Sequence, residues 1–247
     1  MLGKQIRLKK IFKEDNKSVV VAIDHGQFQG PIKGIINIRK ILKDIISGNP
    51  DAIIINPGVL EKNVDLIAGK TSVILRITGA STNYSTCFDY HRIICSVERA
   101  VALGADAVMV MGFIGGNGEN PSLEIISNIA EKCHKYGIPL FVEMLPQQMD
   151  HFTDPEYIAL GARAAFELGA DCLKVYFTSE STFKSVTESV PVPVLIAGGP
   201  KGSDAFKVAE EAISCGAKGV AFGRNVFQSD NPTTYVEKLV NIIHGEK

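Results

Sequence analysis

The chain has 247 residues, of which 45% are hydrophobic, and this length allows one domain built around a single large core. The formal net charge is −1, and only 7% of the residues are aromatic, which argues against a nucleic-acid-binding surface. The five cysteines are scattered without C-x-x-C spacing, which favours reduced thiols over disulfides or a zinc site. We therefore expect a soluble, cytoplasmic α/β protein without a nucleic-acid partner.

The first residues of the chain predict a short helix that packs on the domain. Met1 to Lys13 mix apolar and basic side chains, and they lack the apolar run and cleavage site of a signal peptide. The alternative is a helix that lies on a membrane surface. No stretch of the sequence approaches the roughly 18 apolar residues of a membrane span, so we expect no membrane partner.

Eight short apolar runs recur along the chain with amphipathic segments between them. The runs are nearly continuous and rich in β-branched residues, as in parallel strands that are covered on both faces. The predicted strands are Ser18–Asp24, Asp51–Asn56, Ser72–Ile77, Asp106–Gly112, Pro139–Leu145, Asp171–Tyr176, Val192–Ala197 and Lys218–Phe222. The predicted helices include Phe88–Leu103, Ser122–Tyr136, Pro155–Leu168, Ser203–Cys215 and Thr233–His244.

Glycine marks several joins between a predicted helix and the next strand, as in Gly104-Ala-Asp106, Gly169-Ala-Asp171 and Gly216-Ala-Lys218. Glycine accepts the left-handed turn that ends a helix, so the strand can begin within two or three residues. The uninterrupted βα rhythm predicts a single (β/α)8 TIM barrel over residues 1–247, with a short N-terminal helix. An open doubly wound sheet is the alternative, but no G-x-G-x-x-G follows the first strand.

Lys174 is out of character for a core strand. Strand alternation in Cys172-Leu-Lys-Val-Tyr-Phe177 places Cys172, Lys174 and Tyr176 on one face, and apolar side chains on the other. Since the apolar face should meet the helices, Lys174 points into the barrel. Desolvation there favours the free amine, which can attack a carbonyl and form a Schiff base. A structural, ion-paired lysine near the strand end is the alternative.

Two carboxylates also lie at predicted strand ends. Asp24 points into the barrel mouth, where it can pair with Lys174 or move protons, whereas its ordinary structural role would be to cap the next turn. The adjacent His25 is a weaker candidate for a general base. Glu143 interrupts an apolar strand and needs a partner, for which Lys174 and Arg76 are candidates. A structural ion pair explains Glu143 equally well.

The loops after the last two predicted strands are rich in glycine. Gly198 and Gly199 follow the seventh strand, and Gly223 and Arg224 follow the eighth. Barrels frequently bind phosphate at these loops, where glycine lets backbone N–H groups approach the anion and an arginine adds charge. We therefore expect a small phosphorylated sugar or ketone as substrate. No H-E-x-x-H, EF-hand or P-loop pattern occurs, so we expect neither a metal nor a cofactor.

These motifs together resemble the class I aldolase family, which includes archaeal-type fructose-bisphosphate aldolase, aminodideoxyheptulosonate synthase and the thiolase that degrades phosphorylated autoinducer-2. The resemblance is carried by Ala22-Ile-Asp24-His25-Gly26, Lys174 in the sixth strand, Ala197-Gly198-Gly199-Pro200-Lys201 and Gly223-Arg224-Asn225-Val-Phe-Gln228. It implies that Lys174 is the Schiff-base lysine and Asp24 the acid of the first strand. It also implies that the phosphate is bound by Gly198, Gly199, Gly223 and Arg224.

Several details are most similar to the thiolase branch, namely Asp24-His-Gly-Gln-Phe-Gln29-Gly-Pro31, Arg76-Ile-Thr-Gly-Ala-Ser81, Lys174-Val-Tyr176 and Gln228-Ser-Asp230. One departure concerns the tyrosine proton donor of the aldolase and heptulosonate branches, which stands in a Tyr-Pro-Arg-Gly pattern at the end of strand five. Here the corresponding stretch is Leu145-Pro146-Gln147-Gln148. Tyr176, Glu143 and His25 are the candidates to take over proton transfer.

The leading functional hypothesis is a class I aldolase-like lyase that forms a Schiff base with a small phosphorylated keto compound and cleaves or forms a C–C bond. The first alternative is a thiolase-like, retro-Claisen enzyme that acts on a phosphorylated diketone with coenzyme A as co-substrate. The second is a non-catalytic sugar-phosphate-binding barrel. Relatives commonly add a C-terminal helix that packs subunits, and this chain ends at Lys247. We therefore expect a homo-oligomer that need not form the family's large rings.

Overall fold

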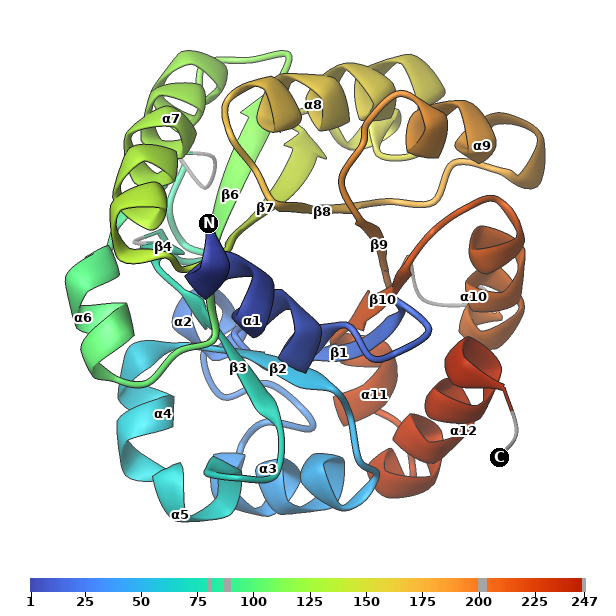
Figure 1. Cartoon of the computed structure of the whole chain (residues 1–247). Helices are drawn as coiled ribbons and strands as arrows, with labels where there is room; N and C mark the ends of the chain where they lie inside the picture. The colour runs from blue at the N-terminus through green and yellow to red at the C-terminus, as the bar shows by residue number, and fades with distance from the viewer. Residues whose placement is uncertain (80, 87–89, 200–203, 246–247) are drawn as a thin grey trace.

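The computed structural model of the protein describes residues 1–79, 81–86, 90–199 and 204–245. Eight parallel strands close into a barrel, and helices surround it, which confirms the predicted (β/α)8 fold (Figure 1). The barrel strands are β1 (Ser18–Ala22), β2 (Ala52–Ile55), β3 (Ser72–Arg76), β6 (Ala107–Ile114), β7 (Leu140–Pro146), β8 (Cys172–Val175), β9 (Val194–Ala197) and β10 (Gly219–Phe222). A separate antiparallel pair consists of β4 (Thr78–Gly79) and β5 (Arg92–Ile93).

Helices connect successive strands, one helix precedes the first strand and, among the described residues, two helices follow the last strand. The helices are α1 (Leu2–Ile11), α2 (Gly26–Gln29), α3 (Ile38–Ser47), α4 (Pro57–Lys62), α5 (Val64–Ile67), α6 (Val97–Ala102), α7 (Glu119–Tyr136), α8 (Pro155–Glu167), α9 (Glu180–Glu188), α10 (Ala205–Ser214), α11 (Arg224–Phe227) and α12 (Pro232–His244). A single 3-10 turn, η1, covers Met149–His151. None of the helices in the described part of the chain is long and apolar enough to cross a membrane.

Strand alternation divides the core into two apolar layers. Side chains such as Val20, Phe141 and Cys172 fill the barrel interior, while their strand neighbours pack against the surrounding helices. Leu173 and Val175 belong to that outer layer, which confirms the predicted orientation of β8. The interior face of this strand therefore carries Lys174 toward the centre of the barrel.

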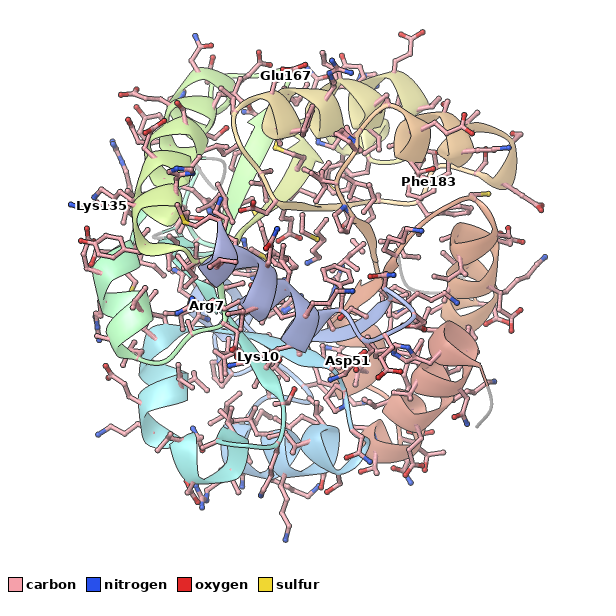
Figure 2. The ribbon with its side chains drawn as sticks, viewed as in Figure 1. Arg7, Lys10, Asp51, Lys135, Glu167 and Phe183 are labelled. Carbon is pink, nitrogen blue, oxygen red and sulfur yellow. The ribbon has the colours of Figure 1, made fainter. Side chains whose placement is uncertain are left out.

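The N-terminal helix α1 closes the N-terminal end of the barrel (Figures 1 and 2). Its Lys4 forms an ion pair with Asp171 at 2.7 Å, and Lys10 pairs with Asp106 at 3.1 Å. Just after the helix, the Phe12 ring is 4% exposed and packs within the barrel interior. These contacts confirm that the helix packs on the domain.

The predicted helix Phe88–Leu103 is wrong over its first half. Its first two residues lie outside the described residues, and Arg92–Ile93 forms the short strand β5 instead. The helix begins only after Ser96, whose side chain accepts a hydrogen bond from the backbone N–H of Arg99 at 3.1 Å. Because this cap satisfies one of the free N–H groups of the first turn, it fixes the start of α6 at that point.

His244, at the end of α12, lies between two carboxylates. Its Nδ1 is 2.8 Å from Asp15 Oδ2, and its Nε2 is 2.9 Å from Asp51 Oδ2. The hydrogen bond to Asp51 and then that to Asp15 raise the pKa of His244 above its usual 6.5, although burial acts in the opposite direction. Because the folded pKa exceeds the unfolded one, these contacts add stability below about pH 6.5 that is lost as the pH rises through the folded pKa.

We therefore expect His244→Gln to lower the free energy of unfolding by about 1.5 to 3 kcal/mol near pH 6, and by much less at pH 9. Urea denaturation of both proteins across this pH range measures the difference. The exposed His134 on α7 supplies the control, since His134→Gln should leave the free energy of unfolding nearly unchanged at every pH. A His244→Gln deficit that does not shrink as the pH rises would contradict this account.

Candidate active site

Four charged side chains meet inside the barrel near the C-terminal ends of its strands. Asp24 follows β1 by two residues, Arg76 ends β3, and Glu143 and Lys174 lie opposite each other on β7 and β8. They are only 5%, 5%, 7% and 5% exposed, respectively. The structure therefore brings together the three buried residues that the sequence singled out for chemistry, and both expected partners of Glu143, Lys174 and Arg76, contact it.

The four side chains form a continuous chain of ion pairs. Arg76 Nε donates to Asp24 Oδ2 at 2.7 Å, and a terminal nitrogen of Arg76 donates to Glu143 Oε2. The other oxygen of Glu143 lies 2.6 Å from Lys174 Nζ. Two cations and two anions thus compensate one another, which buried charges require. Arg76 joins the two carboxylates, so its position decides where both of them point.

The electrostatics of the cluster keep both carboxylates ionised at neutral pH. Burial acts to raise the pKa of Asp24, but Arg76, then His25 and Lys174, outweigh it and hold that pKa well below its usual range. Burial likewise opposes ionisation of Glu143, yet Lys174 and Arg76 lower its pKa overall. Both carboxylates are therefore suited to accept hydrogen bonds, Asp24 from Arg76 and Glu143 from the neighbouring ammonium of Lys174.

A cavity of about 520 Å³ opens at this end of the barrel. It brings together four of the residues that the sequence predicted for the site, namely His25, Glu143, Tyr176 and Arg224. Lys174 is not among the lining residues, but it forms an ion pair with Glu143, which does line the cavity. The remaining lining residues are Phe28, Gln29, Asn83, Ser85, Thr86, Met111, Phe113, Leu145, Pro146, Gln147, Met149 and Phe152.

Tyr176 and Leu145 belong to an apolar wall of this cavity. The Tyr176 ring stacks on Phe152 with centroids 5.2 Å apart, and both Met111 and Phe113 lie in the same apolar cluster. Burial, followed by the charge of Glu143, raises the pKa of Tyr176, so its phenol is protonated at neutral pH. Leu145 stands in this wall at the position where the sequence resemblance predicts a tyrosine. Tyr176, which directly follows the neighbouring strand β8, supplies a phenol to the same wall.

His25 lies beside the cluster and against the last glycine loop. Its Nδ1 is 3.4 Å from Asp24 Oδ1, and its ring contacts Phe227 edge-on with centroids 5.1 Å apart. A Cβ on Gly223 would collide with this ring and would lie 2.9 Å from the backbone oxygen of Ala22. Glycine at 223 is therefore what allows the loop after β10 to approach the site.

Replacing Gly223 by alanine is expected to lower the free energy of unfolding by about 1 to 3 kcal/mol, because the added methyl group overpacks this contact. Urea denaturation measures the loss. Gly58 in α4 is the matched control, since a Cβ there would meet nothing within 4 Å. Gly58→Ala should be neutral or slightly stabilising, because alanine favours helix more than glycine does. Equal losses in the two variants would contradict this interpretation.

The two predicted phosphate loops lie side by side, because β9 and β10 are neighbouring strands with Ala197 opposite Ala221. Gly198 and Gly199 follow the first of these strands, and Gly199 has a positive φ of 41°. Pro200 and Lys201 of the same motif lie outside the described residues. Phosphate binding by Gly198, Gly199, Gly223 and Arg224 stays a prediction.

Sequence reasoning missed most of the cavity wall. Phe28 and Gln29 come from the four-residue helix α2, and Ser85, Thr86 and Phe152 come from loops. Segments this short carry no strand or helix periodicity, so no local pattern marks these residues. Arg76 was expected from the sequence only as a candidate partner of Glu143, and it interrupts an apolar strand in the same way as Glu143. Within the described ranges, no group of three or more histidine, cysteine or acidic side chains is arranged to hold a metal ion.

Comparison with known proteins matches this chain to one family over most of its length. The model of the DeoC/LacD family aldolases matches residues 18–229. The 2-amino-3,7-dideoxy-D-threo-hept-6-ulosonate synthase 1 of Archaeoglobus fulgidus is 38% identical over 99% of this chain and 92% of that protein. The 3-hydroxy-5-phosphonooxypentane-2,4-dione thiolase of Yersinia pestis is 34% identical over 98% of this chain and 82% of that protein.

A solved structure agrees in fold over almost the whole chain. It is an archaeal fructose-1,6-bisphosphate aldolase with its catalytic lysine covalently bound to the carbinolamine intermediate of the substrate, at 30% identity. The alignment covers 98% of this chain and 100% of that chain, with a TM-score of 0.89. The identities to the synthase and the thiolase are similar, so closeness to the thiolase branch stays a prediction. Together with the barrel, these matches show that the chain belongs to the DeoC/LacD aldolase family and is a class I aldolase-type enzyme.

Proposed function

We propose that this enzyme forms a Schiff base between Lys174 and a small phosphorylated keto compound, and cleaves or forms the adjacent C–C bond. The observation that carries the proposal is the buried Lys174, whose Nζ lies 2.6 Å from the Glu143 carboxylate beside a cavity at the C-terminal barrel end. Barrel enzymes hold their chemistry at this end. A buried lysine next to a proton acceptor has what a nucleophilic amine needs.

The reaction begins when the Lys174 ammonium passes a proton along its hydrogen bond to Glu143, which holds it only transiently, and a free amine is left. Attack of the nitrogen on the substrate carbonyl gives a carbinolamine, whose oxygen leaves as water after Glu143 returns the proton. The resulting iminium accepts the electron pair of the adjacent C–C bond when that bond breaks. A carbonyl product forms at the other carbon as its hydroxyl proton passes to a base. Protonation and hydrolysis of the enamine then release the ketone product and restore Lys174.

Glu143, Tyr176 and His25 line the cavity and are the groups that we assign to these proton transfers. Tyr176 is protonated at neutral pH and therefore acts as a donor toward the carbonyl oxygen or the leaving oxygen. Asp24 stays ionised, and it positions Arg76 and accepts a hydrogen bond from a substrate hydroxyl. This route uses no cofactor and no metal.

The phosphate group of the substrate is assigned to Gly198, Gly199, Gly223 and Arg224. Arg224 lines the cavity and can form charge-assisted hydrogen bonds to phosphate oxygens, and the glycines let the backbone N–H groups approach the anion. A phosphate held there leaves the carbonyl end of the substrate to reach Lys174. We expect inorganic phosphate to compete with the substrate and Arg224→Met to raise KM more than it lowers kcat.

Reduction with sodium borohydride tests the proposal across a panel of phosphorylated ketones. The expected result is a gain in protein mass equal to the ketone less one oxygen atom, since imine formation releases water and reduction adds two hydrogens. If no ketone of the panel can be trapped and Lys174→Met retains turnover, the proposal is wrong. Ligand binding without turnover or trapping would instead support a non-catalytic, sugar-phosphate-binding barrel.

A second candidate is acyl transfer from a phosphorylated diketone to coenzyme A. Leu145 favours it, because this apolar side chain lines the cavity at the position where the resemblance to aldolases and heptulosonate synthases predicts a phenol. A thiolase is also among the relatives. Product analysis separates the two candidates: an acyl-coenzyme A product that appears only with coenzyme A supports acyl transfer, and aldehyde release that does not depend on it supports the aldolase reaction.

A further inference from the structure

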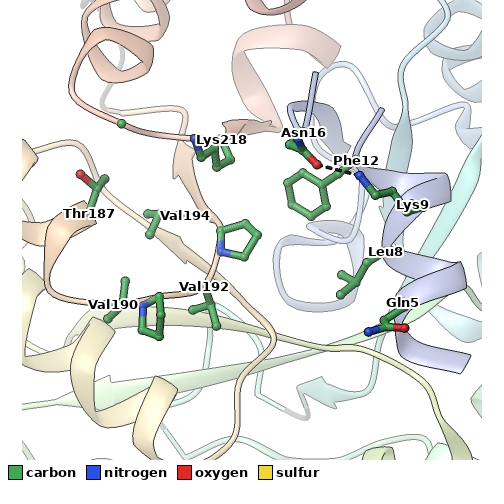
Figure 3. Close-up of a pocket in the computed structure, with 13 residues that line it drawn as sticks. Gln5, Leu8, Lys9, Phe12, Asn16, Thr187, Val190, Val192, Val194 and Lys218 are labelled. Carbon is green, nitrogen blue, oxygen red and sulfur yellow. Dashed lines mark hydrogen bonds between the residues drawn. The ribbon is translucent and has the colours of Figure 1, made fainter. Parts of the chain in front are cut away.

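A second cavity, of about 680 Å³, lies at the opposite end of the barrel from Lys174. It is bounded by α1 and by the segments that lead into β9 and β10, whereas the candidate active site lies where those strands end (Figure 3). Its volume falls in the range of about 300 to 1,000 Å³ that is typical of small-molecule sites. The cavity is therefore large enough for a ligand distinct from the substrate.

Most of the lining of this N-terminal cavity is apolar. Leu8 and Phe12 contribute from the side of α1, while Val190, Val192 and Val194 contribute from the side of β9 (Figure 3). Thirteen residues line the cavity, and no aspartate or glutamate is among them. Apolar side chains gathered around an open cavity gain free energy when an apolar ligand displaces water from them.

The wall beside β9 is held in place before any ligand arrives. Pro191 and Pro193 alternate with the valines, and each proline ring fixes its own backbone φ. The carbonyl of Pro193 accepts a hydrogen bond from Leu173 N at 2.9 Å, and the carbonyl of Val194 accepts one from Lys218 N at 2.8 Å. A preformed wall loses little conformational entropy on binding, which favours affinity for a small ligand.

Two cations belong to the lining without any balancing carboxylate. Lys9 and Lys218 are exposed, and in the part of the chain that the structure describes neither of them forms an ion pair. The ammonium of Lys9 donates to Asn16 Oδ1 at 2.8 Å, a contact with a neutral partner. Figure 3 shows both lysines in the upper half of the view, with Leu8 and Val192 below them. An apolar cavity bordered by two such cations matches a ligand with an apolar body and an acidic group.

We propose that the N-terminal cavity binds a small amphipathic anion, namely an aromatic or medium-chain carboxylate. Its apolar body lies on the valines and prolines before β9 and on Leu8 of α1. Its carboxylate is attracted by the ammonium groups of Lys9 and Lys218, which border the cavity on opposite sides of Phe12 in Figure 3. This ligand differs from the polar, phosphorylated substrate class assigned to the other end of the barrel, so the proposal does not rest on the proposed function.

Fluorescence titration with 8-anilinonaphthalene-1-sulfonate tests this site, because the probe combines aromatic rings with a fixed anion and the protein has no tryptophan. We expect one saturable site per chain, from which decanoate displaces the probe. The Lys9→Met/Lys218→Met variant should bind the probe at least tenfold more weakly, since it keeps apolar stems and loses both charges. Lys43→Met, at an exposed position of α3, is the matched control and should bind like the unchanged protein.

The uncharged analogue N-phenyl-1-naphthylamine separates charge from packing, and it should bind the double variant and the unchanged protein equally. The proposal is wrong if probe affinity is the same in the double variant, or if Lys43→Met weakens binding as much. It is also wrong if inorganic phosphate or phosphorylated ketones displace the probe, which would place it in the other cavity. Sedimentation provides a further test of the surface. If the unchanged protein is an oligomer and the double variant is not, the surface is a subunit contact and the proposal is wrong.

Discussion

Replacing Lys174 by methionine or by arginine is expected to lower kcat by about 10⁴-fold or more, because either change removes the amine that forms the imine. The arginine variant is the informative one. It keeps a positive charge that can pair with Glu143, yet a guanidinium stays protonated and cannot attack a carbonyl. A purely electrostatic role for this cation would leave the arginine variant active, whereas covalent catalysis leaves both variants inactive.

The measurement for Lys174 is steady-state turnover of the phosphorylated ketone that the unchanged enzyme accepts, together with urea denaturation of each variant. We expect Lys174→Arg to remain folded while losing turnover, because its charge still balances Glu143. Activity of that variant within tenfold of the unchanged enzyme would refute the Schiff-base role. If the methionine variant is too unstable to assay, the arginine variant alone still decides the question.

The second large effect is expected for Arg76→Met, which should lower the free energy of unfolding by about 3 to 5 kcal/mol at pH 7. Arg76 lies between Asp24 and Glu143, and its loss leaves one buried carboxylate without its principal cation. The exposed pair of Arg39 with Asp65 provides the control. There we expect Arg39→Met to change the free energy of unfolding only slightly, because water already screens the charges.

The pH dependence of the Arg76→Met deficit follows from the pKa of Asp24. Arg76 holds that pKa well below its usual range, so the pairing stabilises the fold at neutral pH and this contribution is lost as the pH falls through the folded pKa. Without the guanidinium, Asp24 can bind a proton in the folded state at a higher pH. The deficit measured by urea denaturation should therefore shrink from pH 7 to pH 4. A deficit that grows over this range would contradict the assigned pairing.

Arg76→Met should also lower turnover, but for a different reason than the substitutions of Lys174. Arg76 does not line the cavity, but it holds Glu143 through one oxygen while Lys174 contacts the other. We therefore regard it as a positioning residue, and expect its loss to lower kcat more than it raises KM. Arg76→Lys, which keeps the charge but cannot reach both carboxylates in the same fork geometry, should recover part of the stability and less of the rate.

Strand periodicity was sufficient to predict which charged residues face the barrel interior. Alternation along a strand is fixed by backbone geometry, so Lys174 follows directly from the apolar character of Leu173 and Val175. The same rule placed Asp24 inside, whereas Glu143 was singled out because a carboxylate that interrupts an apolar strand needs a partner. Alternation did not reveal that Arg76 joins the two carboxylates, because strands far apart in the sequence bring these residues together only when the barrel closes.

The parts that the sequence did not predict lie in segments whose structure depends on distant contacts. The stretch before α6 has apolar and polar residues spaced as in a helix, yet Arg92–Ile93 pairs with Thr78–Gly79 across the chain. Pairing of this kind overrides a local preference. Phe28 reaches the cavity from the short helix α2 and Phe152 from the segment after η1, and their place in the wall depends on how β1 and β7 lie in the closed barrel.

Peptide mapping after borohydride reduction tests the central claim most directly, because it locates the trapped substrate on one lysine of the intact enzyme. We expect the adduct to form on Lys174, to be absent without the ketone, and to be suppressed by inorganic phosphate, which competes for the phosphate loops. An adduct on any other lysine at comparable yield, or one that forms equally well in Lys174→Arg, would contradict the assignment of Lys174 as the Schiff-base residue.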